Sequence, residues 1–196
     1  MAKKEIIKIE LEKPLLVRRY DYSTNKKSDL KLEIVPGLTV IQKKVGRDLG
    51  RGPETTTLEP GTHLIKREKT KAVIPLPFIN IVKSYEYYFF AFRSGDLSIK
   101  GETTIEGKRA NVEFVTSFRD PNSFHFNAMG AMAKYTEADL FRFLLAALEE
   151  TPSYKERAAP LLEKNGKIEV TDSFSEFGER LERYGLAKPR IYFVLH

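Results

Sequence analysis

The sequence predicts an α+β protein, and three observations carry that prediction. Up to about residue 130, apolar and polar residues alternate at a period near two, which is typical of strands. Beyond residue 130 the apolar residues recur at a period near 3.6, which is typical of amphipathic helices. Two short strands are interleaved with these helices. We therefore expect a β-rich part, residues 1–130, with an antiparallel or mixed, strongly twisted sheet, and an α/β part, residues 131–196, packed on it as one continuous globular unit.

Four alternating runs before residue 45 predict strands, which we place at residues 5–12, 15–22, 30–34 and 38–44. A polar turn at residues 23–29 and the Pro36-Gly37 pair separate them. The glycine-rich loop 46–53 invites comparison with a phosphate-binding loop. It lacks the Lys-Ser/Thr end of a P-loop and no helical pattern follows it, so we interpret it as a strand connection.

A basic segment follows a Pro-Gly turn at residues 58–63. Its cations are Lys66, Arg67, Lys69 and Lys71. We interpret them as the outward face of an edge strand, because lysines on an edge discourage unwanted pairing. A localisation signal or a basic patch for nucleic acid, anionic lipid or an acidic partner is the alternative.

The most apolar segment of the first half is residues 73–82, and it contains two prolines. Proline cannot donate to a sheet ladder, so the segment is expected at an edge or in a loop. Its apolar side chains are then candidates for contact with a partner or a membrane surface, namely Ile74, Leu76, Phe78 and Ile79. The alternative is that the segment covers the end of the core.

The next strands are aromatic and then amphipathic. Residues 85–92 carry aromatic rings on both alternating faces, which predicts a strand buried on both sides; stacking of nucleic-acid bases on these rings is the alternative. After a turn at residues 94–96, strands at 97–105 and 110–118 are predicted to form a hairpin around residues 106–109.

Helices dominate the remainder. Thr136, with Asp139 three residues later, is a predicted N-cap for a helix that ends at residues 149–152. A second helical stretch, 153–164, is broken by Pro160, and a strand is expected at 167–171. Ser173-Phe174-Ser175-Glu176 has the pattern of a capping box for a last helix that stops at Gly185. A final strand is predicted at 190–195.

The composition limits the chemistry of any site. The chain has 196 residues, 41% of them apolar, which is enough for a substantial core. It has no cysteine, which excludes disulfides, thiolate metal sites and cysteine nucleophiles. Its three histidines are far apart in sequence, at His63, His125 and His196. We therefore expect no metal, no cofactor and no catalytic triad, although carboxylate pairs of the glycosidase kind are not recognisable from sequence.

Several motifs, in their order and spacing, resemble the stomatin, prohibitin and flotillin family, also called the band 7 or SPFH domain. The first two are Val35-Pro36-Gly37 before a strand and Leu58-Glu59-Pro60-Gly61-Thr62-His63, which is similar to the family's L-x-P-G-x-H turn. Ser94-Gly95-Asp96 is similar to a polar turn before its central hairpin, and Phe118-Arg119-Asp120-Pro121 to a strand end. The run from Phe177 to Leu186, followed by a strand, resembles the family's last helix and strand. The resemblance spans roughly residues 33–196.

This resemblance implies a non-catalytic scaffold that self-associates as a homo-oligomer and organises a membrane-proximal or multisubunit complex. The sequence carries neither an apolar N-terminal anchor nor a C-terminal coiled coil, so the expectation is a soluble, minimal version in the cytoplasm, with peripheral contact to a membrane or a membrane protein. Its composition also resembles that of heat-adapted proteins. The alternatives are a basic nucleic-acid-binding module, favoured by the 20 basic against 12 acidic residues in 1–100, and a viral or phage-type structural subunit.

Overall fold

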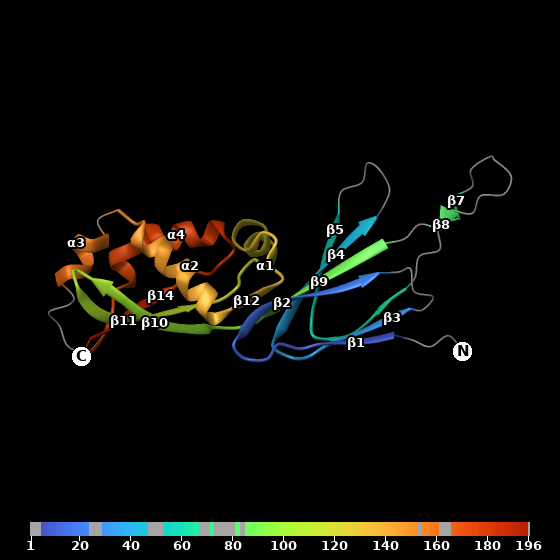
Figure 1. The fold of residues 1–196 in the computed structure, drawn as a ribbon, viewed down its shortest axis with the longest axis horizontal. Coiled ribbons are helices and arrows are strands. Elements are labelled where there is room, and N and C mark those ends of the chain that lie inside the picture. The colour runs from blue at the N-terminus through green and yellow to red at the C-terminus, as the bar shows by residue number, and fades with distance from the viewer. Residues whose placement is uncertain are drawn as a thin grey trace. The chain divides into compact units, whose positions relative to one another are not determined.

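The computed structural model of the chain describes residues 5–23, 29–46, 53–66, 71–72, 81–82, 85–152, 154–160 and 166–195 (Figure 1). Its strands and helices confirm the α+β class. Contacts divide the chain into two units, Met1–Glu12 with Val17–Arg93, and Lys13–Leu16 with Ser94–His196. The change of pattern at residue 130 is therefore not where the units part: the hairpin 97–116 belongs with the helices, because its second strand pairs with the last strand of the chain.

The first unit contains two sheets. The smaller has the order β1-β3-β6, in which β1 is parallel to β3 and β3 antiparallel to β6. The larger has the order β12-β2-β9-β4-β5, of which β12 and residues 15 and 16 of β2 are assigned to the second unit. A two-stranded ribbon, β7-β8, is separate. The bounds are β1 Glu5–Ile9, β2 Leu15–Ser23, β3 Leu30–Ile34, β4 Leu38–Gly46, β5 Glu54–Leu58, β6 Gly61–Ile65, β7 Lys71–Ala72, β8 Ile81–Val82, β9 Tyr85–Arg93 and β12 Lys134–Thr136.

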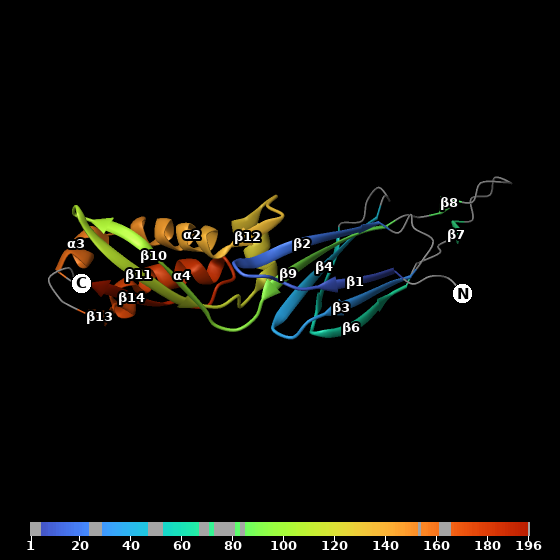
Figure 2. The same cartoon turned by 60° about the horizontal axis from the view of Figure 1, so that its bottom comes forward.

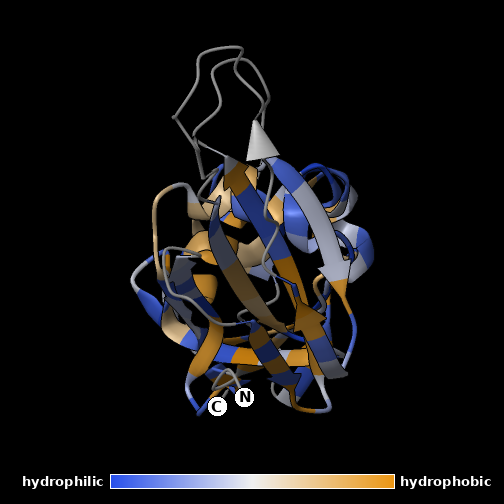
Figure 3. Cartoon of the chain, turned by 90° about the vertical axis from the view of Figure 1, so that its right-hand side faces the viewer, coloured by the Kyte–Doolittle hydropathy of each residue, from blue (hydrophilic) through white to orange (hydrophobic). Residues whose placement is uncertain are grey.

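The core of the first unit lies between its two sheets. Alternate side chains of β3 and β9 meet there; Figure 3 shows apolar and polar residues alternating along the strands. The members of this core include Leu30, Leu32, Ile34, Tyr87, Phe89 and Ala91. The prediction that β9 is buried on both sides is confirmed for residues 89–92, whereas Tyr85, Glu86 and Tyr88 at its start are only half-buried.

Two turns carry the chain between these sheets. Val35-Pro36-Gly37 leads from β3 to β4, and Gly37 has a φ of 82°, which a residue with a side chain adopts only at a cost. The return from β5 to β6 is tighter than predicted: β6 begins at Gly61, so His63 is a strand residue opposite Leu32, and its Nε2 lies 2.8 Å from the Glu59 carbonyl oxygen. These two motifs therefore fix how the chain passes from sheet to sheet.

The second unit packs helices on one face of a four-stranded antiparallel sheet of order β10-β11-β14-β13 (Figures 1 and 2). Its hairpin turns at Glu106 and Gly107, whose φ values are 50° and 79°.

No helix in the described part of the chain has the length and apolar character to cross a membrane. The bounds are β10 Leu97–Ile105, β11 Lys108–Thr116, β13 Gly166–Glu169, β14 Arg190–Leu195, α1 Pro121–Phe124, α2 Glu137–Glu149, α3 Tyr154–Ala158 and α4 Ser175–Arg183, with a π-helical turn at His125–Met129 and a 3-10 turn at Thr171–Phe174.

The helix ends confirm one predicted cap and correct another. Thr136 caps α2, and its side chain and that of Asp139 form a reciprocal capping box. The predicted box at Ser173 is wrong, because Thr171–Phe174 form a 3-10 turn, α4 starts only at Ser175, and its N-cap, Phe174, makes no side-chain capping bond. The Glu176 carboxylate instead accepts a hydrogen bond from Arg157. The predicted stop at Gly185 is confirmed, with φ of 80° and a Leu186 N–H bond back to the Leu181 carbonyl.

Candidate interaction surface

One face of the β10-β11-β14-β13 sheet carries most of the charged side chains of its strands. Strand residues alternate between the two faces, and Leu97, Ile99, Thr103 and Ile105 of β10 are buried while Ser98, Lys100, Glu102 and Thr104 are exposed. We call the face opposite the helices the open face. From the strand registers, its described members include Ser98, Lys100, Glu102, Asn111, Glu113, Val115, Arg190, Tyr192, Val194, Lys167 and Glu169.

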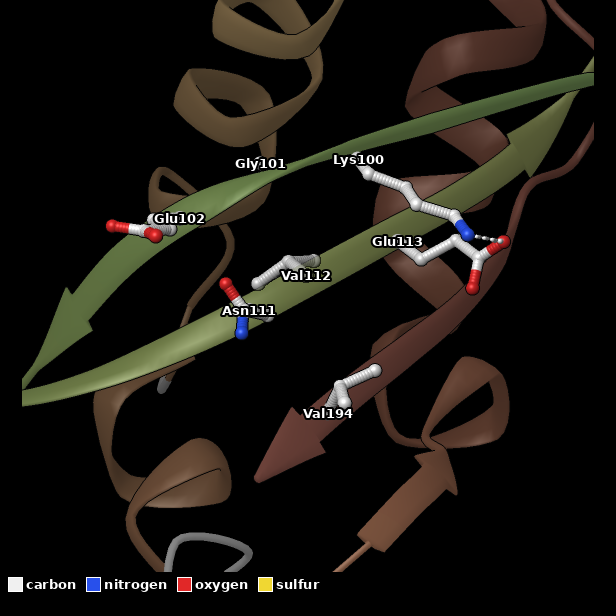
Figure 4. Close-up of a pocket in the computed structure, with 7 residues that line it drawn as sticks. All are labelled: Lys100, Gly101, Glu102, Asn111, Val112, Glu113 and Val194. Atoms are coloured by element: carbon white, nitrogen blue, oxygen red, sulfur yellow. Dashed lines mark ion pairs between the residues drawn. The ribbon is translucent and has the colours of Figure 1, made fainter. Parts of the chain in front are cut away.

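Glu113 lies at the centre of the open face and is nevertheless only 8% exposed. Its Oε1 accepts a hydrogen bond from Ser98 Oγ at 2.7 Å, and its Oε2 one from Lys167 Nζ at 2.6 Å. Lys100 Nζ lies 3.7 Å from Oε1 (Figure 4). The donors on Lys167 and Ser98 hold the pKa of Glu113 below its ordinary value, because they stabilise the charged form. The carboxylate thus joins β10, β11 and β13.

Lys167 reaches Glu113 across β14. Its Nζ lies 4.2 Å from the centre of the Tyr192 ring, a cation–π contact, on its way from β13 to β11. Figure 4 shows Lys100 and Glu113 pointing toward one another and Glu102 pointing away from them. A hollow of about 410 Å³ lies here, lined by Lys100, Gly101, Glu102, Asn111, Val112, Glu113 and Val194.

This surface holds its charges in fixed positions. Glu113 has both oxygens engaged and a lowered pKa, so at neutral pH it is a fixed anion and not a proton donor. In the described residues no group of three or more His, Asp and Glu is placed to hold a metal ion. Lys100 and Lys167, whose side chains are 71% and 50% exposed, present cations to the solvent.

A second hollow, of about 580 Å³, lies along α4. It is lined by Asn127, Glu176, Glu179, Arg180, Arg183 and Tyr184. Arg157 pairs with Glu176 at 3.2 Å, and Arg180 pairs with Glu150. These pairs tie α4 to α3 and to the end of α2, so their charges serve packing of the second unit.

The candidate contact residues predicted from the sequence are largely beyond what the structure describes. Ile74, Leu76, Phe78 and Ile79 lie outside the described residues, as do Arg67 and Lys69. Lys71 belongs to β7, but its side chain is not described. Lys66 follows the end of β6 and is exposed, as an edge position would be. The roles predicted for these residues stay predictions.

Sequence reasoning missed Glu113. A signal was present, because Glu113 interrupts an otherwise apolar run in β11. Its partners could not have been found, since Ser98 and Lys167 lie 15 and 54 residues away in sequence and meet Glu113 only through the strand registers.

The structure brings together two motifs on which the family resemblance depends. The N–H groups of Arg119 and Asp120 both donate to the Gly185 carbonyl oxygen at 2.9 Å, and Arg119 forms an ion pair with Glu182 at 3.0 Å. Asp120 also caps α1, and its hydrogen bonds to the Ser123 side chain and to the N–H groups of Ser123 and Asn122 lower its pKa. The motif residues therefore hold the end of β11 against the end of α4.

Comparison with protein-family models gave no match, and neither curated proteins nor solved structures matched the chain.

Proposed function

We propose that this chain is a non-catalytic scaffold subunit of the SPFH kind, copies of which associate with one another and organise a membrane-proximal or multisubunit complex. The observation that carries the proposal is the placement of the motif residues. Those at 35–37 and 58–63 turn the chain between the sheets of the first unit, and those at 118–121 meet Gly185 in the second. They serve the architecture, as the motifs of a structural subunit would.

The open face supports an assembly role. Its central carboxylate is paired with lysines from β10 and β13, and Ser98, Glu102, Glu169 and Arg190 on the same face are exposed. Such a surface offers directional charge pairs, which give interfaces their specificity and register more than their affinity.

The test is sedimentation velocity of the purified chain at low and high salt. The proposal predicts a discrete species larger than the 22.5 kDa monomer at both salt concentrations. A single monomeric species over the whole accessible concentration range would contradict it.

The segment 73–82 supplies the proposed contact with lipid or a further partner. The double variant Phe78→Asp and Ile79→Lys is expected to weaken vesicle binding or assembly while the thermal transition is unchanged, because charges replace apolar contact residues. Equal vesicle binding by the variant and the parent chain would remove this segment from the proposal.

A nucleic-acid-binding module remains the second candidate, because the first unit carries 18 basic and 11 acidic residues. Its aromatic strand offers rings beside cations: Arg19 lies 5.5 Å from the Tyr88 ring centre and Lys43 lies 5.4 Å from that of Phe90. Arg19 is also paired with Asp21 at 2.8 Å. A base stacking on these rings would have to displace the cations, which favours the scaffold proposal. Absence of an oligonucleotide shift at low salt would exclude this candidate.

A further inference from the structure

The sheet of the second unit ends in two strands, β10 and β13, whose outer edges carry no other strand among the described residues. An open edge presents N–H and C=O groups that are available to pair with another chain. β10 is nine residues long and contains no proline, and the side chains that it directs toward the helices are uncharged. It therefore lacks two of the features that block edge pairing, a proline and an inward-pointing charge, and its charged residues, Lys100 and Glu102, lie on the open face.

The strand registers show which residues direct their backbone groups to these edges. The hairpin turn has two residues with positive φ, so it closes on a hydrogen-bonded pair, Ile105 and Lys108. Hydrogen-bonded pairs alternate along an antiparallel ladder, so Lys100 and Glu102 direct their backbone groups outward. In β13 the Val170 N–H bonds the facing Ile191 carbonyl at 2.9 Å, so by the same alternation Lys167 and Glu169 point theirs outward.

Strand direction and side-chain face are compatible as well. The four strands alternate in direction, so β10 of a second copy, placed beside β13 with its open face on the same side, runs antiparallel to it. All four charged residues on the two edges have their side chains on the open face. The sheet can therefore continue from one copy into the next without turning over.

We propose that β13 of one copy pairs antiparallel with β10 of the next, with Lys167 opposite Glu102, Ile168 opposite Gly101 and Glu169 opposite Lys100. This inference rests on the proposed self-association and names the contact that produces it. Opposite charges then face each other at both hydrogen-bonded pairs, an arrangement that stabilises a sheet. The backbone groups allow this register, and the charges favour it over the others that the backbone allows.

Neighbouring registers are disfavoured. A shift of two residues places Lys167 opposite Lys100, or Glu169 opposite Glu102, and like charges directly opposite one another destabilise a pair. A shift of one residue sends the charged side chains to the other face. The charges therefore select one register.

The apolar pair in this register also fits. The Phe141 ring packs so closely on Gly101 that an added Cβ would lie 2.4 Å from it. Ile168 is half-buried in one copy, and opposite Gly101 its side chain lies on the helix side of the sheet, beside Phe141 of the next copy. Its remaining exposed surface is then covered.

Carbodiimide cross-linking of a one-to-one mixture of ¹⁵N-labelled and unlabelled chains tests the proposal, because this reagent joins a carboxylate to an amine in contact. We expect mixed-isotope links between Lys167 and Glu102 and between Lys100 and Glu169. The Lys167–Glu113 link, whose atoms are 2.6 Å apart within one copy, is the internal control and should occur within single isotopes.

The outcomes separate the two proposals. A chain that is monomeric in sedimentation overturns both the scaffold and the edge pairing. A larger species whose expected links are missing, or occur only within single isotopes, overturns the edge pairing and leaves the scaffold standing.

A charge exchange gives an independent measurement of the same register. Lys100→Glu and Glu169→Lys are each expected to weaken association roughly fivefold, since each places like charges opposite one another. The double variant restores the pair and should return within about twofold of the parent. Glu156→Lys, on the exposed surface of α3, makes the same charge change as Glu169→Lys outside the register and should have no effect. Losses that simply add in the double variant would overturn the proposed pairing.

Discussion

At the scale of single residues, Glu113 is a charge that organises the surface around it and is not simply solvated. It is nearly covered although it lies on the polar side of the sheet, because Ser98, Lys100 and Lys167 close over it. A carboxylate left there without these donors would be costly. The cluster therefore fixes the position of β13, the strand that the proposed contact uses.

Glu113→Gln is expected to lower the free energy of unfolding by about 1 kcal/mol, because charge-assisted hydrogen bonds become neutral ones. Chemical denaturation measures this. Glu156→Gln is the matched control, since Glu156 is exposed on α3 and belongs neither to the cluster nor to the proposed contact; it should change stability by less than about 0.5 kcal/mol. Equal losses in both variants would remove the special role of Glu113.

The same carboxylate makes stability depend on pH. The pKa of Glu113 is lowered from its ordinary value of 4.5 on folding, so the unfolded chain binds the proton more tightly than the folded one. The stabilisation is complete above the ordinary value and is lost as the pH falls through the lowered one. The stability difference between the parent chain and Glu113→Gln should therefore shrink on acidification below about pH 4.5. A difference that stays constant into strong acid would contradict this.

Gly185 is a second residue with a sharp prediction. Its φ is 80°, and an added Cβ would lie 2.2 Å from the Asp120 carbonyl oxygen. Gly185→Ala should destabilise the protein by about 2 kcal/mol or more, through backbone strain and the clash together. Gly95→Ala isolates the strain, because Gly95 has a φ of 85° with open space around it. Thermal melts in which the two variants shift equally would show that the close approach to Asp120 has no effect.

At the scale of elements, two similar capping patterns in the sequence have different outcomes: the box at Thr136 forms, and the box at Ser173 does not. Thr136→Ala should cost about 1 kcal/mol, because it removes the capping bond to the Asp139 N–H of α2. Ser173→Ala should cost less than about 0.5 kcal/mol, since Ser173 lies inside the 3-10 turn and does not cap α4. Urea denaturation of both variants checks the pair. A larger loss at Ser173 would restore the box that the sequence suggested.

Sequence patterns located most elements because burial alternates in step with them. β3 is an example: Leu30, Leu32 and Ile34 are buried and the residues between them are not. β5 was not predicted, because Thr55, Thr56 and Thr57 are all exposed and give no alternation of apolar and polar residues. The prediction of a cap at Ser173 was wrong because the same local sequence can form either a capping box or a 3-10 turn. The candidate site was the least predictable part, since Glu113 and Lys167 are related only by strand registers over a long separation.

At the scale of the whole molecule, edge pairing between β13 and β10 is a heterologous contact. Each copy has one of each edge, so the contact repeats and gives a ring if the rotation closes and a filament if it does not. The discrete species that the scaffold proposal predicts corresponds to the ring, because a filament would give a mass that rises with concentration.

Salt should affect this association only modestly. The charge pairs are exposed and therefore screened, but the backbone hydrogen bonds and the cover over Ile168 persist. We expect the association constant to fall less than about tenfold between 50 mM and 500 mM salt, measured by light scattering. A steep power-law loss with salt would instead indicate an association held mainly by charge.

The native mass of the purified chain tests most directly whether copies of it associate. Light scattering on the eluting peak of a size-exclusion column, over a wide range of loaded concentrations, measures the native mass without presuming a partner. Self-association predicts a discrete mass that is a multiple of 22.5 kDa and is lowered by Lys100→Glu. A mass of 22.5 kDa at every concentration would contradict it.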